Sequence, residues 1–335
     1  MTAHMPHAGR IGGRAGLSPL AWAVAAAALA LAIAAPFLLY PVFLMKFLCF
    51  ALFASAFNLL IGYAGLLSFG HAAFFGGAAY VTAHAVKVWG VTPEIGILLG
   101  TAAAGVLGLA IGFLAIRRHG IYFAMITLAL SQMVYFVALQ APFTGGEDGI
   151  QAVPRGSLFG LIDLSRPLAM YFFVLAVTVG GFLLIRRIIH SPFGQVLKAI
   201  RENEPRAVSL GYRVERYKLA AFVMSAALSG LAGGTKALVF QLASLTDIQW
   251  QMSGEVVLMT LLGGMGTILG PAAGAFVVVS LQNFLAASAF PVTVLTGGIF
   301  ILCVLLFRRG IVGEIGWRLG SRRARADARR TRMKR

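Results

Sequence analysis

His71, Lys236 and Glu255 are ionisable side chains within the apolar part of this sequence that could do chemistry there. If the apolar runs span a membrane, carboxylates and histidines near its middle can couple the movement of a solute to that of an ion. Structural roles compete with this one. Lys236 and Glu255 could pair or extend to the membrane surface. His71, which follows Gly70, could be buried at a helix contact and bonded to a backbone carbonyl.

Other kinds of site have no counterpart in the sequence. No Gly-x-x-x-x-Gly-Lys-Ser/Thr stretch occurs, and the Gly-Gly-Thr-Lys run at 233–236 lacks the spacing that cradles a phosphate. The six histidines show no zinc spacing, and Cys49 and Cys303 form no Cys-x-x-Cys motif. We therefore predict no catalytic residue, no metal and no cofactor bound by this chain. If transport is driven by ATP and Mg²⁺, hydrolysis must occur on another chain.

One long polar stretch, the inner loop at about 190–217, interrupts the apolar sequence and carries signals for helix ends. Ser191 can cap a helix whose first residue is Pro192. Pro205 cannot continue that helix but can begin another, which Gly211 is well placed to end. The loop is therefore predicted to form a helix, a kink and a short second helix.

The length and charge of the inner loop favour a docking role. A connector between membrane helices needs only a few residues, whereas this one has about 28. Val196, Leu197 and Ile200 give the first helix a small apolar face bounded by charges of both signs. Such an element suits a groove on a cytosolic partner, with charge pairs setting the register and the apolar face supplying contact. A solvated loop without a partner is the alternative. Asn203 or Glu204 would cap the second helix.

The elements that position these residues are long apolar runs. The chain has 335 residues, of which 59% are hydrophobic and 12% charged, against about 25% charged in soluble domains. Since a membrane-spanning helix needs about 20 apolar residues, we predict an all-α, polytopic transmembrane bundle of about 8–10 segments with glycine-broken helices. The 40 glycines suit close helix packing.

Ten segments are candidates, and two of them are broken by glycines. They fall at about 20–40, 42–61, 64–85, 95–116, 121–140, 169–189, 218–241, 253–264, 271–289 and 291–307. The first is interpreted as a retained helix rather than a cleaved signal. Broken helices expose backbone groups to the translocation path of many transporters. The path candidates are therefore Ser68, Gly70, His71, Glu255, Gly264, Gly266 and Gly270.

Positive charge predicts the orientation. Lys/Arg clusters after about residue 116, at 186–218 and in the tail 308–335 fall on one side of the membrane, which we take as cytoplasmic together with the N-terminal segment 1–19. The membrane domain then covers 20–307. The net charge is +17, of which +9 lies in the tail, so we expect anchoring to anionic lipid rather than nucleic-acid binding.

A second polar stretch, the external loop at about 141–168, contains TGGEDGIQAVPRG and falls on the opposite side. It is long enough to contact an external partner. Gly145 and Gly146 are its candidate contact residues.

Five blocks, in order, resemble a known family: NLLIGYAGLLSFGHAAFFGGAAY (58–80), RRHGIYFAMITLALSQ (117–132), TGGEDGI (144–150), SPFGQVLKAIRENEPRAVSLGY (191–212) and SGEVVLMTLLGGMGTILGPAAGA (253–275). The sequence is similar to LivM-type permease subunits of branched-chain amino acid ABC importers. The resemblance covers roughly 55–307 and excludes the basic tail.

The resemblance implies a bacterial inner-membrane subunit that works with a LivH-type permease, two cytosolic ABC ATPases and a periplasmic substrate-binding protein. It also implies that the inner loop carries a coupling helix. Carried over by position, the coupling residues are Glu202, Glu204, Arg206, Ala207, Leu210 and Gly211. The substrate could instead be urea or an amide. An ion-coupled secondary transporter or channel, or a purely structural membrane subunit, remains a competing class.

Overall fold

The computed structural model describes residues 30–37, 39–285 and six further residues: 297, 298, 301, 310, 311 and 314. The predicted N-terminal segment 1–19, most of the segments at 20–40 and 291–307, and all but three residues of the tail lie outside the described residues.

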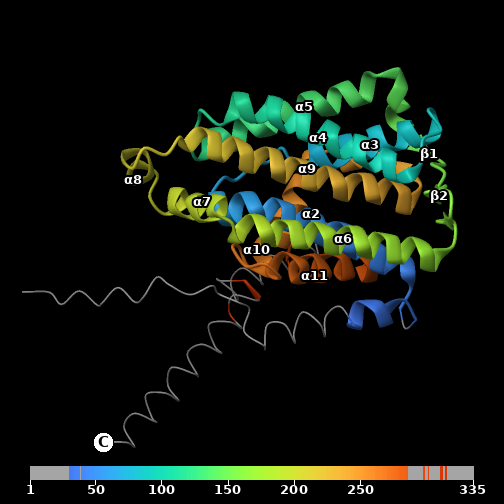
Figure 1. Ribbon diagram of the computed structural model, residues 1–335. Coiled ribbons are helices and arrows are strands. Elements are labelled where there is room, and N and C mark those ends of the chain that lie inside the picture. Colours follow the sequence, from blue (N-terminus) through green and yellow to red (C-terminus); the bar gives the residue numbers. More distant parts are fainter. Residues whose placement is uncertain are drawn as a thin grey trace, which may run out of the picture.

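The described chain is helical almost throughout (Figure 1). The α-helices are α2 (Pro41–Asn58), α3 (His71–Lys87), α4 (Pro93–Ala115), α5 (Ile121–Gln140), α6 (Pro167–His190), α7 (Pro192–Glu202), α8 (Glu204–Ser209), α9 (Val214–Phe240), α10 (Trp250–Gly263) and α11 (Gly270–Leu285). Shorter turns are η1 (Ala35–Phe37), η3 (Pro142–Thr144), η4 (Gly146–Asp148) and η5 (Leu245–Asp247), and η2 (Leu59–Ala64) is a π-helix that continues α2. Proline begins α2, α4, α6 and α7, where its missing N–H costs no helix bond.

Five helical spans within the described residues are long and apolar enough to cross a membrane: Pro41–Ala64, Pro93–Ala115, Ile121–Gln140, Pro167–His190 and Val214–Phe240. They confirm the predicted polytopic α-helical membrane bundle. Both predicted glycine breaks are also present, since Gly65–Gly70 precedes α3 and the turn at 264–269 separates α10 from α11.

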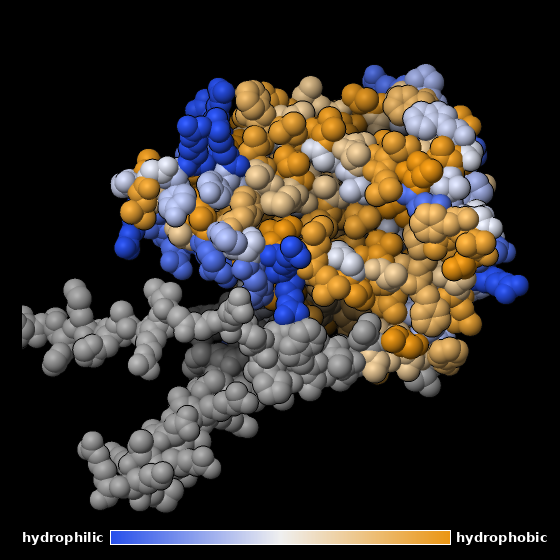
Figure 2. All heavy atoms as spheres, in the orientation of Figure 1, coloured by the Kyte–Doolittle hydropathy of each residue, from blue (hydrophilic) through white to orange (hydrophobic). Residues whose placement is uncertain are grey.

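The bundle has a buried centre and an apolar surface. The apolar stretches of α2–η2 and α9 are 83% and 72% buried, whereas those of α4, α5 and α6 are 28–39% buried. The outer helices expose large apolar side chains, among them Leu98, Phe113, Met133 and Leu183. Figure 2 shows this apolar surface along the sides of the bundle, with hydrophilic residues gathered towards its ends. Such a band suits the hydrocarbon core of a bilayer.

Helices α3, α4 and α9 approach closely because glycines line their contacts. A Cβ at Gly233 of α9 would overlap the carbonyl of Phe75 in α3, and one at Gly108 of α4 would overlap Ala226 of α9. This agrees with the expectation that small residues allow close packing between membrane helices.

The two polar loops lie at opposite ends of the bundle (Figure 1). The inner loop forms α7 and α8 at one end. The external loop lies at the other end, where strand β1 (Ile150–Gln151) pairs antiparallel with β4 (Leu242–Ala243), and β2 (Ser157–Leu158) pairs with β3 (Ile162–Asp163). The arrangement agrees with the crossing pattern expected from the sequence.

Candidate coupling and translocation site

The inner loop folds as its helix signals predict. The Ser191 hydroxyl accepts a hydrogen bond from the Gly194 N–H at 3.3 Å, and α7 then runs to Glu202. Asn203, one of the two predicted caps, accepts from the Arg206 N–H at 3.0 Å and begins α8. Gly211 adopts φ +84°, a conformation that favours glycine, directly after the second helix.

The apolar face of the inner loop turns into the bundle, contrary to the expectation that it contacts a partner. Leu197 and Ile200 of α7 and Ala207 of α8 are all buried. Ile200 and Ala207 pack together with Val214 at the start of α9. The driving force is burial of apolar surface on the bundle itself. Ala207 therefore helps to hold the loop against the bundle.

Other apolar side chains lie at the exposed tip of the loop. Leu210 is 69% exposed and Val208 is 57% exposed. Glu202 at the end of α7 and Arg206 in α8, in the same loop, are also exposed. This tip combines apolar contact area with charges of both signs, which suits recognition by a partner. Val208 was not among the candidates from sequence.

Glu204 holds the loop against two other elements. Its carboxylate lies 2.7 Å from Lys218 Nζ of α9, and 3.8 Å from His119 Nδ1 in the turn between α4 and α5. The Lys218 side chain is only 5% exposed, so the α9 partner of this ion pair is held in place by the surrounding bundle. Glu204 therefore joins the inner loop to the rigid bundle, a position at which a movement of the loop would reach α9.

The first glycine break is internally hydrogen-bonded. Ser68 Oγ accepts from the Gly70 N–H at 3.1 Å, and His71 is the first residue of α3. His71 is buried, and its Nε2 lies 2.8 Å from Ser225 Oγ. Because Ser225 donates its proton to the Ala56 carbonyl at 2.6 Å, His71 Nε2 must be the donor to Ser225. His71 is thus buried at a helix contact, as the structural alternative predicted, but its hydrogen-bond partner is the Ser225 hydroxyl and not a backbone carbonyl.

The second break, at 264–269, meets the π-helix η2. Gly264 and Gly266 adopt φ +117° and +75°, which allows the chain to turn between α10 and α11. Thr267 Oγ1 accepts from the Gly270 N–H at 3.1 Å and donates to the Gly264 carbonyl at 2.8 Å. The Gly266 N–H donates to Asn58 Oδ1 at 2.9 Å. Two parts of the chain about 200 residues apart therefore come together here.

Lys236 pairs with Asp247, so the possible pairing of Lys236 with Glu255 is wrong. Lys236 Nζ lies 2.7 Å from Asp247 Oδ1 and 2.6 Å from Oδ2. Glu255 instead accepts from Gln282 Nε2 at 3.1 Å. The hydropathy pattern places Asp247 in an outer loop, yet Asp247 is 2% exposed.

The external loop is tied to the end of α9. The Val153 N–H donates to the Gln241 carbonyl at 3.0 Å, and Arg155 Nη2 donates to the Val239 carbonyl at 2.8 Å. Gly145 and Gly146 adopt φ +79° and +61°, and a Cβ at Gly145 would overlap the Gly149 carbonyl. Both glycines therefore shape the loop.

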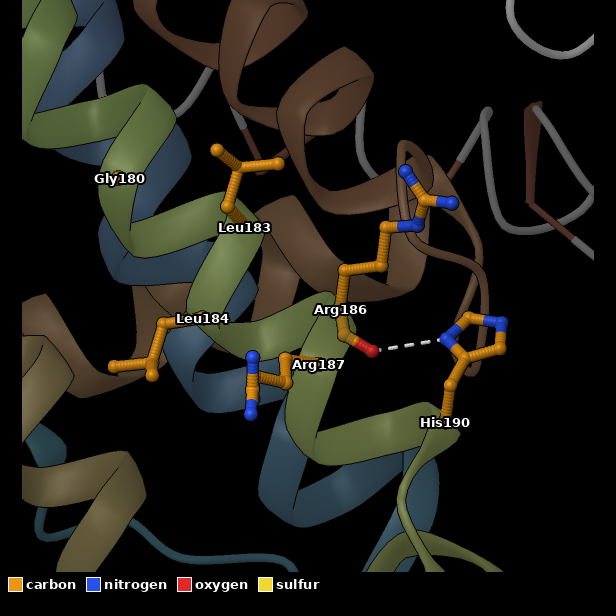
Figure 3. A pocket seen from close by; sticks show the side chains of 6 residues that line it. All are labelled: Gly180, Leu183, Leu184, Arg186, Arg187 and His190. Atoms are coloured by element: carbon orange, nitrogen blue, oxygen red, sulfur yellow. Dashed lines mark hydrogen bonds between the residues drawn. The ribbon is translucent and has the colours of Figure 1, made fainter. Parts of the chain in front are cut away.

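A shallow hollow of about 540 Å³ lies at the end of α6 (Figure 3). Gly180, Leu183 and Leu184 line its apolar part, and Arg186, Arg187 and His190 line its basic part. His190 Nδ1 donates to the Arg186 carbonyl at 2.9 Å. The lining changes from apolar to cationic along the helix, as at the boundary between acyl chains and headgroups of a bilayer.

In the described part of the chain, no group of three or more His, Cys, Asp or Glu side chains could hold a metal ion.

The sequence of the membrane domain is similar to those of known proteins over most of its length. The family model described as "Branched-chain amino acid transport system / permease component" matches residues 39–307. The high-affinity branched-chain amino acid transport system permease protein LivM of Escherichia coli (strain K12) is 29% identical over 283 residues, covering 76% of this chain and 65% of the relative. The chain thus spans about two thirds of the length of that protein. No solved structure matches.

Two further relatives show how widely this architecture is shared. The probable branched-chain amino acid transport permease protein LivH of Methanocaldococcus jannaschii is 25% identical, over 71% of this chain and 78% of the relative. The ribose import permease protein RbsC of Bacillus subtilis is 29% identical, over 66% and 70%. The family match covers most of the chain and all five long apolar spans. This multi-pass helical membrane protein therefore belongs to the family of permease components of branched-chain amino acid transport systems.

Proposed function

We propose that this chain is the permease subunit of an ATP-driven ABC importer that moves branched-chain amino acids into the cell. The observation that carries the proposal is the inner loop, which is anchored to α9 through Glu204 and Lys218 and presents Val208 and Leu210 at its tip. The sequence has no P-loop, so two cytosolic ABC ATPases would bind the tip and supply the energy. Alternating access would follow from movement of the loop.

The proposal includes further partners and a location. A LivH-type permease would pair with this chain in the bacterial inner membrane, and a periplasmic substrate-binding protein would dock at the end formed by the external loop. Both termini would be cytoplasmic. Ion coupling is less well supported, because Lys236 and Glu255 both have protein partners within the bundle.

Uptake by proteoliposomes tests this function. The tagged chain, purified from its host with its co-purifying ATPases and LivH-type permease, should accumulate leucine against a gradient only with ATP and the binding protein. Leu210→Asp should reduce the amount of ATPase that co-purifies with the tagged chain at least about tenfold, which is the effect of losing a contact worth about 1.4 kcal/mol. Leu161→Asp is the matched control, since Leu161 is 88% exposed in the external loop.

Two results would reject the importer. One is uphill accumulation by the chain alone, which would indicate a secondary transporter. The other is normal ATPase recovery and uptake with Leu210→Asp. Urea, acetamide and ribose replace leucine in parallel assays, and uptake of one of these in place of leucine would reassign the substrate.

We also propose that the hollow at the end of α6 holds an anionic phospholipid, its phosphate near Arg187 and its acyl chain along Leu183 and Leu184. A basic residue near the membrane surface contributes about 1 kcal/mol of attraction to anionic lipid. Arg187→Gln should therefore weaken retention of phosphatidylglycerol roughly fivefold.

Native mass spectrometry of the purified chain would measure the retained lipid. The control is Arg213→Gln, which removes one exposed cation outside the hollow. Equal loss of lipid in both variants would show that only total charge matters, and would overturn the site.

A further inference from the structure

The π-helix η2 is bound by the inner loop. A π-helix closes its hydrogen bonds between residues five apart, and such turns occur often at functional sites. The carbonyl of Gly62, in the middle of η2, accepts a hydrogen bond from Arg201 Nη1 near the end of α7. The ammonium of Lys198, also on α7, lies 5.7 Å from the centre of the Tyr63 ring, within the range of cation–π attraction. Two cations of α7 therefore contact two consecutive residues of η2.

The π-helix η2 and Asn58, the residue before it, are also bound to the turn between α10 and α11. Asn58 Nδ2 donates to the Thr267 carbonyl at 2.8 Å, while Asn58 Oδ1 accepts from the Gly266 N–H at 2.9 Å. The Tyr63 hydroxyl donates to the Gly266 carbonyl at 2.9 Å. One side-chain amide and one phenol thus fix both backbone groups of Gly266.

These contacts leave no space between the three segments. A Cβ at Gly62 would lie 2.7 Å from the Gly266 nitrogen and would also overlap the Asn58 side chain. At Gly65, where η2 ends with φ +73°, a Cβ would lie 3.0 Å from Arg201 Cγ. Closely packed segments move together, because interiors are dense and hydrogen bonds weaken steeply when misaligned.

We propose that Arg201, Tyr63 and Asn58 are positioning residues that connect the inner loop to the α10–α11 turn through the π-helix. The consequence for transport rests on the proposed function, in which ATPases move the inner loop. The π-helix is the element with two arrangements: if Arg201 withdraws from Gly62, η2 can relax towards α-helical geometry. That change rotates Tyr63 away from Gly266 and releases the turn.

Amide hydrogen exchange of the full chain in detergent tests the connection without any partner. Arg201→Met should accelerate exchange about tenfold both in 59–66 and in 264–270, the size expected from losing one hydrogen bond to a charged group. Arg216→Met is the matched control, because Arg216, near the start of α9, is also an exposed arginine at the inner-loop end of the bundle. Acceleration confined to α7, or equal in the control, would overturn the proposal.

A conservative variant separates the two halves of the connection. Tyr63→Phe removes only the hydroxyl that binds Gly266 and keeps the ring beside Lys198. It should accelerate exchange in 264–270 and leave α7 unchanged. In the double variant with Arg201→Met, the two effects on 264–270 should be less than additive, as expected of residues in one network. Full additivity would contradict the route through η2.

Transport by the assembled complex provides the final readout. Arg201→Met and Tyr63→Phe should both retain the ATPases and lower the amount of leucine moved per ATP hydrolysed by several-fold. Failure of the ATPases to bind the unmodified chain would reject the importer but not the connection measured by exchange. Accelerated exchange with an unchanged transport ratio would overturn the positioning role.

Discussion

Asp247→Ala is expected to destabilise the protein by about 3–5 kcal/mol, the usual cost of removing one partner of a buried ion pair. Both carboxylate oxygens of Asp247 lie within 2.7 Å of Lys236 Nζ. The Lys236 side chain is only 12% exposed, so its ammonium would remain buried without a counter-charge. The ring of Phe240, 5.4 Å from that ammonium, offers only weak compensation.

Thermal unfolding in detergent would measure this effect. The double variant Lys236→Met/Asp247→Leu should recover most of the lost stability, since removing both charges removes the uncompensated ion. Asp148→Ala, at an exposed aspartate of the external loop, should change stability by less than about 0.5 kcal/mol. An effect of Asp247→Ala no larger than that of Asp148→Ala would show that the pair is unimportant for folding.

Gly233→Ala is expected to destabilise the protein by about 3 kcal/mol, the upper end of the usual cost of overpacking a core, although it adds a single methyl group. The new Cβ would overlap the carbonyl of Phe75, where α9 crosses α3. Backbone cannot rotate away as a side chain can, so the two helices must separate at the centre of the bundle.

The sign of the effect should reverse at a glycine without such a neighbour. A Cβ at Gly254 of α10 would meet nothing within 4 Å, and alanine favours a helix over glycine by about 0.8–1.0 kcal/mol. Gly254→Ala should therefore leave the thermal midpoint unchanged or raise it. Comparable losses in both variants would show that glycine at 233 is not needed for close approach.

Hydropathy and residues that mark helix ends predicted most of the fold. The segment at 121–140 has the bounds expected from the sequence, and α7 and α8 begin at Pro192 and Glu204 after their predicted caps. These features depend on residues close together in the chain. The same is true of both glycine breaks, where the signal is the glycine itself.

The contacts that connect distant segments could not be predicted in this way. Arg201 binds a backbone carbonyl in a π-helix, and neither the carbonyl nor the extra residue of that helix has a recognisable sequence pattern. Asp247 lies in a stretch with the composition of an outer loop, and its burial in an ion pair with Lys236 depends on a residue of another helix. Asn58 and Tyr63 lie within a block that carries the family resemblance, and a polar amide in an apolar run was a usable signal.

The surface of the inner loop was only partly predictable for a related reason. An apolar face on a short helix can pack inward or bind a partner, and its periodicity is the same in both cases. Leu197 and Ile200 pack inward. Leu210 was a candidate through the family resemblance, and its exposure at the tip makes it the sharper probe of partner binding.

Helix α9 has a mechanical consequence for how the two faces of the membrane could open in turn. It has 27 residues, so it forms a rod of roughly 40 Å. Near one end of α9, Lys218 is paired with Glu204. At the other end, the Val239 carbonyl accepts a hydrogen bond from Arg155, and the Gln241 carbonyl, directly after the helix, accepts one from the Val153 N–H. Between them, its tightest approach to α3 is at Gly233. Because α9 packs most tightly against α3 between these two ends, a displacement of one end by the inner loop would tilt the helix about that contact and move the other end in the opposite direction.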